Sequence, residues 1–231
     1  MPLSPSTRTH LRRLHSLTGV VPVGFFLVEH FFTNSFAMFG PEAFNEKVEF
    51  LTGLPYLYAL EIGLIGVPIA FHALLGILFW WEGRGNVLRF GYFRNWMFAL
   101  QRITGLLLVA FIAVHVYKTR LSGVAADEMF QHMAGYLGSP AWAIFYAAGV
   151  VAASFHLGNG LFTFGIVWGL LPGVRSQRWA QRASVAVIVL MSLVGLNALL
   201  AFTNHDVELL NKPEKSVVRV SAEGSERGEA R

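Results

Sequence analysis

Residues 58–81 read YALEIGLIGVPIAFHALLGILFWW, with one charged side chain, Glu61, near the start and one histidine, His72, within. A helix needs about 20 residues to cross a hydrocarbon layer of roughly 30 Å, at a rise of about 1.5 Å per residue. The stretch is long enough to cross, and its residues do not alternate as they would in a strand of a membrane β-barrel. We therefore predict a membrane-spanning helix that carries one imidazole.

Four further stretches have the same character, at about 17–39, 96–117, 139–174 and 183–203. They are almost free of charge, apart from Glu29 in the first and Arg102 near the beginning of the second. Hydrophobic residues make up 54% of the chain and charged residues 14%, which is about half the usual quarter of a soluble domain. The sequence therefore predicts an all-α, polytopic membrane protein with five transmembrane helices.

Composition also excludes several kinds of chemistry. The chain has no cysteine, so it cannot form disulfides, thiolate zinc sites, protein-bound iron–sulfur clusters, thiol nucleophiles or covalent c-type haem links. Its net charge of +4 is spread over loops and a tail, without the basic stripe that binds nucleic acid. We expect no nucleic-acid partner.

The distribution of Lys and Arg predicts the orientation. The N-terminal segment and every second loop hold ten of these residues, and the alternate loops hold three. The ten are Arg8, Arg12, Arg13, Arg84, Arg89, Arg94, Arg102, Arg175, Arg178 and Arg182, and the three are Lys47, Lys118 and Arg120. By the positive-inside rule the N-terminus is cytoplasmic and the C-terminus lies outside. We expect a cytoplasmic segment at 1–16, a membrane domain at 17–205 and a polar, disordered tail at 206–231.

Histidines are the most unusual feature of the predicted spans. Four of the eight lie one apiece in the first four spans, namely His30, His72, His115 and His156. The others, His10, His15, His132 and His205, lie at span borders, in loops or in the tail, where a histidine needs no special explanation. Ionisable groups within a bilayer are costly and are functional candidates, although a single one can simply be a polar group hydrogen-bonded between helices.

The depths of these four histidines fall into two levels. At about 1.5 Å per residue, His30 and His115 lie roughly 20 and 28 Å from the inner boundary. His72 and His156 lie roughly 9 and 8 Å from the same boundary. We therefore predict an outer pair and an inner pair.

Two imidazoles that face each other from separate helices are the ligands of a b-type haem. Zinc would need three or four ligands at one point, and a proton relay would need polar residues between the two levels, where aliphatic residues and Phe dominate. A cytochrome of the respiratory b/c1 type would place two histidines on each of two helices. We predict that the first four helices form a haem-binding bundle; a cofactor-free transporter or structural anchor is the alternative.

Two short patterns recur along the chain. His-x-x-x-Gly occurs at 72–76 and 156–160 and places a glycine one turn past the histidine, where a bulky residue would meet a ring. Thr-Gly occurs at 18–19 and 104–105, each time upstream of an outer-level histidine. These repeats suggest that the first two spans are faintly duplicated in the next two, although Gly and Thr are common at membrane helix interfaces.

Several segments together resemble a known family. These segments are LRRLHSLTG at 11–19, RNW at 94–96, LQRITG at 100–105, FHLGNGL at 155–161 and RSQR at 175–178. They resemble the dihaem cytochrome b membrane anchor of succinate:quinone oxidoreductases (succinate dehydrogenases and fumarate reductases), most closely the single-subunit, five-helix form. The resemblance covers about 10–203.

The resemblance implies two haems b, with His72 and His156 ligating the proximal one and His30 and His115 the distal one. It implies a flavoprotein subunit with FAD and an iron–sulfur subunit, both docked on the cytoplasmic side of a bacterial inner membrane. The resemblance also allows a higher oligomer of the whole complex. Electrons from succinate, oxidised on a partner subunit, would reach a quinone, which we expect to be menaquinone. A fumarate reductase anchor working in the reverse direction is the alternative.

The quinone site is less well defined by the sequence. Glu29 and Glu61 are acidic residues within the spans, toward the outer half, and could transfer protons. Glu61 could equally be an ordinary carboxylate at the membrane interface. Arg13 and Ser16 could instead line a quinone site on the inner side. The inner arginines, Arg13 and Arg102 among them, are also candidates for binding haem propionates.

Overall fold

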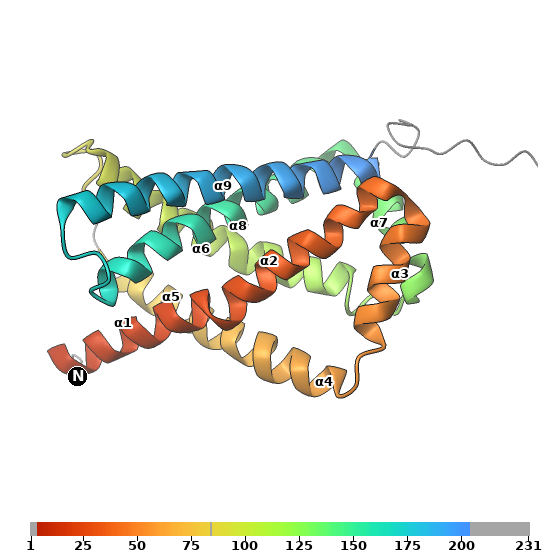
Figure 1. Ribbon diagram of the computed structural model, residues 1–231, viewed down its shortest axis with the longest axis horizontal. Coiled ribbons are helices and arrows are strands. Elements are labelled where there is room, and N and C mark those ends of the chain that lie inside the picture. The colour runs from red at the N-terminus through yellow and green to blue at the C-terminus, as the bar shows by residue number, and fades with distance from the viewer. Residues whose placement is uncertain (1–3, 84, 204–231) are drawn as a thin grey trace, which may run out of the picture.

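The computed structural model of the chain describes residues 4–83 and 85–203, and all regular elements in this part are helical (Figure 1). In order they are α1 (Pro5–Val20), α2 (Pro22–Ser35), η1 (Phe36–Phe39), α3 (Pro41–Thr52), α4 (Leu57–Leu60), η2 (Glu61–Gly66), α5 (Val67–Glu82), α6 (Phe93–Lys118), η3 (Ala126–Glu128), α7 (Met129–Leu137), α8 (Pro140–Val167) and α9 (Val174–Thr203). The predicted tail at 206–231 and His205 lie outside the described residues.

Five helical segments are long and apolar enough to cross a membrane. They are Pro5–Phe39, Leu57–Glu82, Phe93–Lys118, Pro140–Val167 and Val174–Thr203. Each contains one of the five predicted spans or most of it. The all-α, polytopic fold class is therefore confirmed.

The first helix begins earlier than the apolar run. α1 begins at Pro5, and the Ser4 side chain caps it by accepting a hydrogen bond from the Thr7 amide at 3.2 Å. A serine cap followed by proline is a strong helix start. The border predicted between 1–16 and the membrane domain therefore falls inside a helix, because the N-terminal arginines end the apolar run without ending the helix.

Prolines interrupt the first two spans. Val21 separates α1 from α2, since Pro22 has no amide hydrogen to donate and its ring clashes with the preceding turn. In the second span a π-helical segment, η2, precedes Pro68. Such segments are frequently found at functional sites. Both breaks lie within the membrane-spanning part of the chain.

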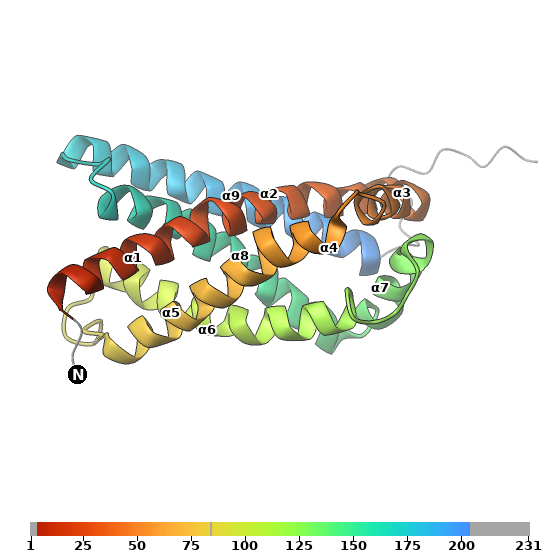
Figure 2. The same cartoon turned by 90° about the horizontal axis from the view of Figure 1, so that it is seen from below.

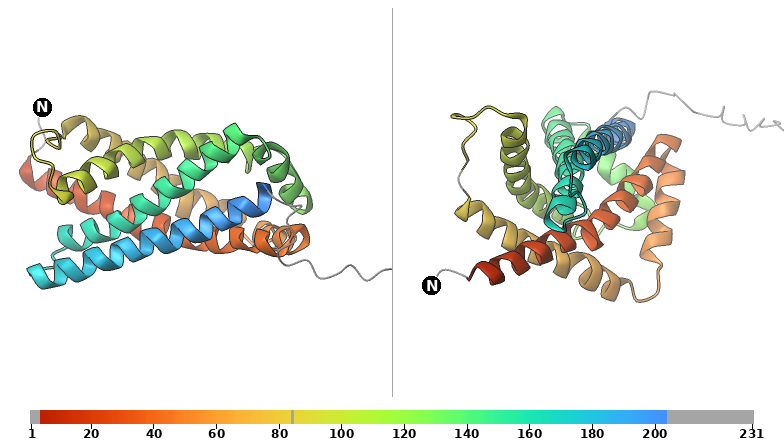
Figure 3. Two further views of the ribbon diagram at one scale, coloured as in Figure 1. Left: turned by 90° about the horizontal axis from the view of Figure 1, so that it is seen from above. Right: turned by 60° about the vertical axis from the view of Figure 1, so that its left-hand side comes forward.

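The first four spans form a closed ring. α1 packs on α5 and α8, and α6 packs on both α5 and α8, while α9 lies outside the ring against α8 and α2 (Figures 2 and 3). We call the end of the ring where α1, α6 and α9 begin the arginine end, because it carries nearly all the arginines of residues 4–83 and 85–203. The opposite end, where α2 and α9 finish, is the cap end.

Two short helices, α3 and α7, close the cap end (Figure 1). Phe44 of α3 packs edge-on against Phe130 of α7 and Phe202 of α9 in the main apolar core. Buried Asn45 joins the two helices, since its Oδ1 accepts from the Phe130 amide at 2.9 Å and its Nδ2 donates to the Asp127 carbonyl. The cap is thus a small packed unit on top of the bundle.

Candidate functional site

The four intramembrane histidines meet as two pairs. The rings of His72 on α5 and His156 on α8 have centroids 6.1 Å apart, with their planes at 83°. The rings of His30 on α2 and His115 on α6 have centroids 5.6 Å apart, with their planes at 79°. The first pair lies toward the arginine end and the second toward the cap end. The structure therefore brings together the same partners that the depth calculation pairs.

These pairs suit two bis-histidine haems. Two imidazoles that bind one metal ion from opposite sides at about 2.0 Å have centroids about 6 Å apart. Within the described residues no group of three or more His, Asp or Glu could hold a metal ion, so a zinc-type site is not formed there. In the part of the chain that the structure describes, the buried Nδ1 atom of His115 has no hydrogen-bond partner, so no polar contact at this atom ties the ring to another helix. The four paired histidines therefore fit two bis-histidine haems.

Glycines of α1 and α6 make room for the first pair. A Cβ atom at Gly19 would lie 2.3 Å from Cε1 of His72, and one at Gly105 would lie 3.1 Å from Cε1 of His156. Each glycine follows a threonine whose hydroxyl donates to the two carbonyls three and four residues earlier. Gly19 therefore makes room on α1 for the His72 ring of α5, and Gly105 makes room on α6 for the His156 ring of α8. This shared role of the two Thr-Gly segments supports the suggested duplication.

The glycines of the His-x-x-x-Gly pattern lie against side chains of neighbouring helices, and their predicted clearance for a cofactor ring stays a prediction. A Cβ atom at Gly76 would lie 3.3 Å from Nε2 of His15, and one at Gly160 would lie 3.8 Å from Nε2 of Gln101. These glycines therefore face side chains of α1 and α6 and not the rings of the paired histidines. The glycines that lie against those rings are the ones in the Thr-Gly segments.

Hydrogen-bonding partners fix the two histidines that lie near the arginine end, His72 and His156. Nδ1 of His72 donates to the backbone carbonyl of His15 at 2.8 Å, which leaves Nε2 of His72 without a proton. Nδ1 of His156 lies 3.3 Å from the Thr104 hydroxyl, and Gln101 donates to the His156 carbonyl at 3.0 Å. Buried Asn159 in turn donates to Gln101 at 2.8 Å. Both rings are therefore fixed by neighbours on α1 or α6.

The histidines toward the cap end are held mainly by aromatic rings. His30 stacks on Phe26 and His115 stacks on Phe111, with centroids 5.4 and 5.6 Å apart, respectively. Tyr146 contacts the edge of His115 at 5.8 Å between centroids. In both helices the aromatic residue lies four positions before the histidine, so the two occupy the same helix face.

His15, which is not among the predicted site residues, lies inside the site. Its ring stacks on His72 with centroids 3.9 Å apart and planes at 15°. His15 is one turn before Gly19, so that both face α5; this spacing is the signal that could have identified it. His15 lies just before the apolar run that starts at Leu17, where a histidine needs no special explanation.

Arg102, a predicted propionate ligand, contacts the end of α5 in the structure. Its guanidinium donates to the carbonyls of Phe79 at 3.3 Å and Gly83 at 3.1 Å, and also to that of Trp80. Cations stabilise helix C-termini by binding these otherwise unpaired carbonyls. Arg102 therefore holds α5 to α6.

Arg13 and Ser16 meet a residue that sequence analysis did not select. The indole N–H of Trp168, at the end of α8, donates to the Ser16 hydroxyl at 3.1 Å. The Arg13 guanidinium lies 5.6 Å from the Trp168 ring centroid. These three side chains form a polar group at the arginine end, which joins α1 to α8.

The two predicted acidic residues are engaged in different ways. Glu61 forms a two-pronged ion pair with Arg120, at 2.8 and 3.0 Å, and this pair joins the second span to the loop after the third. The hydrogen bond to Glu61 raises the pKa of Arg120. Glu29 accepts a hydrogen bond from Thr33 of its own helix at 2.6 Å.

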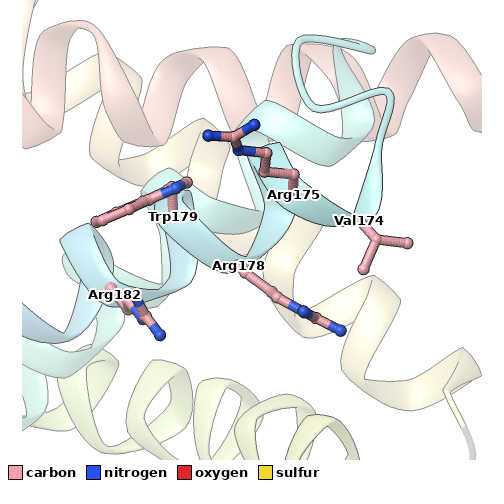
Figure 4. Close-up of a pocket in the computed structure, with 5 residues that line it drawn as sticks. All are labelled: Val174, Arg175, Arg178, Trp179 and Arg182. Carbon is pink, nitrogen blue, oxygen red and sulfur yellow. The ribbon is translucent and has the colours of Figure 1, made fainter.

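Three of the inner arginines lie on the surface at the start of α9. Arg175, Arg178, Arg182 and Trp179 line an open hollow at the start of α9 (Figure 4). All four are exposed. They give the arginine end a positively charged face that is available to a partner.

Two matches to known proteins agree with this geometry. Residues 86–199 match the family model described as the succinate dehydrogenase/fumarate reductase transmembrane subunit. The chain is also 42% identical over 201 residues to the succinate dehydrogenase cytochrome b558 subunit of Bacillus subtilis (strain 168). That alignment covers 87% of this chain and 100% of the relative.

Proposed function

Because the chain belongs to the family of succinate dehydrogenase cytochrome b membrane subunits, we propose that it links succinate oxidation on partner subunits to the reduction of a quinone in the membrane. As a cytochrome b subunit it is a haem protein and an integral part of an oxidoreductase complex. The observation that carries the finer proposal is the pair of facing imidazoles at each of two levels.

Two haems b are the proposed cofactors. His72 and His156 would ligate the proximal one, and His30 and His115 the distal one. When bound, these groups supply one-electron couples at the two levels. The chain contributes the ligands, their fixed orientation and an apolar surrounding, while Gly19 and Gly105 leave the proximal imidazoles unobstructed.

The arginine end is the proposed docking face for the partner subunits. We place it in the cytoplasm, with the C-terminus outside, because Lys and Arg gather there. An iron–sulfur subunit would contact this face, and a flavoprotein subunit with FAD would oxidise succinate beyond it. The exposed arginines at the start of α9 support this assignment (Figure 4). The proposed location is a bacterial inner membrane.

The quinone, which we propose to be menaquinone, has two candidate sites. At the cap end, the Glu29 carboxylate lies next to His30 in the chain and can hold or release a proton on the oxygen that Thr33 does not use. Moving a charge across the membrane costs about 2.3 kcal/mol per 100 mV, so a second haem level is useful if the quinone reacts at that end. Glu61 is the less suitable carboxylate there, because Arg120 already binds both of its oxygens.

The second candidate site is at the arginine end. Ser16, Arg13 and Trp168 present a hydroxyl, a guanidinium and an indole N–H within one small group. Donors of this kind can bind and orient a quinone carbonyl. Ser16→Ala would weaken quinone reduction if this site is used and would leave it unchanged if the cap end is used.

Spectra of the purified complex test the proposal. Wild type should show reduced b-type α-bands with two midpoint potentials and should copurify with a flavin subunit. His72→Ala and His115→Ala should each remove one haem, and a different one. A colourless protein would instead favour a cofactor-free transporter or structural anchor. Comparing succinate:quinone with quinol:fumarate turnover decides between the succinate-oxidising direction and its fumarate-reducing alternative.

A further inference from the structure

The ring of His15 is inserted between residues of α5. It stacks on His72 on one side, with centroids 3.9 Å apart, and meets the edge of Phe79 on the other, with centroids 5.5 Å apart. Between them is Gly76, where an added Cβ would lie only 3.3 Å from Nε2 of His15. Residues 72, 76 and 79 are spaced along one face of a helix, so they form a hollow that the imidazole fills.

α1 fixes His72 by three features within five residues. The His15 ring covers one face of the His72 imidazole, and the His15 backbone carbonyl accepts a hydrogen bond from Nδ1 of His72 at 2.8 Å. Gly19 faces its Cε1 without a side chain. The hydrogen bond leaves Nε2 as the unprotonated nitrogen of His72, and the stacked His15 ring limits rotation of the His72 ring.

The corresponding position in the second Thr-Gly segment is different. His15 is four residues before Gly19, and Gln101 is four residues before Gly105. Gln101 binds the His156 backbone and Asn159, and it places no ring on the His156 imidazole. The two imidazoles of this pair are thus oriented by different means, and only His72 has an aromatic partner from α1.

We propose that His15 is a positioning residue that sets the ring plane of His72 and thereby the electronic state of the proximal haem. This inference rests on the proposed function, because it assigns His72 as an axial ligand. The orientation of an axial imidazole affects the spectrum and the midpoint potential of a low-spin haem. Fixing that orientation is therefore one way in which a protein tunes the cofactor. His15 acts through His72 and does not itself bind the iron.

The test uses the complete complex in membranes, with electron paramagnetic resonance spectra and redox titration of each haem. His15→Ala and His15→Gln remove the ring but retain the backbone carbonyl, and the second reproduces the residue of the other Thr-Gly segment. Both should shift the resonance position and midpoint potential of the haem that His72→Ala removes. His15→Phe, which keeps an aromatic ring, should restore them toward wild type. His10→Ala, at an exposed position on the same helix, is the matched control and should change neither haem.

Gly76→Val gives an independent route to the same change, since the added side chain would push the His15 ring out of its hollow. The inference is overturned if His15→Ala leaves both haems as in wild type, if it shifts the distal haem, or if His15→Phe fails to restore the proximal one. Loss of a haem in both His15→Ala and His15→Phe would make His15 a ligand and would also overturn it. A wild-type complex without haem would refute the proposed function itself. Failure of the His15 inference and failure of the proposed function therefore give different results.

Discussion

Gly19→Ala adds one carbon atom against the ring of His72. That atom would lie 2.3 Å from Cε1 and 2.7 Å from Nδ1 of His72, whereas ordinary contact begins near 3.4 Å. The imidazole must therefore move by about 1 Å, and metal–ligand distances tolerate only about 0.2 Å. The same movement would break the bond from Nδ1 to the His15 carbonyl, which contributes about 1 kcal/mol. We expect the complex to lose the proximal haem and keep the distal one.

Haem content per flavin, measured by pyridine haemochrome spectra with a redox titration of the remaining haem, checks this expectation. Gly105→Ala is the graded comparison, since its Cβ would lie 3.1 Å from His156 and a shift of a few tenths of an ångström would relieve it. It should change a midpoint potential without loss of haem. Gly135→Ala in α7, which has open space, should alter neither haem. Retention of both haems at wild-type potentials in Gly19→Ala would refute the reasoning.

Three further substitutions test the supports around the site. Arg102→Gln should lower the thermal midpoint of the complex, because the carbonyls at the end of α5 lose charged donors worth about 1.5–3 kcal/mol each; Arg89→Gln, at an exposed position, is its control. Glu61→Gln should cost at most about 1 kcal/mol, and less at high salt, because its ion pair with Arg120 is partly exposed; a large loss that salt does not change would contradict this. Asn45→Ala should cost about 1–3 kcal/mol by leaving the Phe130 amide unpaired. Hydrogen exchange should then rise in the cap while both haems remain.

The spans and the two histidine pairs could be predicted from sequence because each depends on properties that act along the chain. Apolar runs fix where a helix can cross the bilayer, and the rise per residue fixes the depth of each histidine. The start of α1 at Pro5 could have been predicted too, since Ser4 and Pro5 form a recognisable helix start. Charge density predicts where the chain enters the membrane, which is a separate question from where the helix begins.

What the sequence could not provide are contacts that depend on how helices cross. His15 lies on His72 only because α1 and α5 approach closely opposite Gly76. Arg102 reaches the end of α5 only because α6 begins beside the point where α5 stops. Spacing along one helix defines which residues share a face, but it does not determine which residues of another helix meet that face.

The break at Val21 distinguishes the two halves of the suggested duplication. His30 is 11 positions after Gly19, whereas His115 is 10 positions after Gly105. In an unbroken helix one extra residue turns a side chain by about 100°. α6 has no break, whereas the first span is interrupted at Val21, two residues after Gly19, where Pro22 begins α2. Both spans nevertheless place their glycine against one histidine pair and their histidine in the other, so the two repeats share contacts without sharing the same spacing.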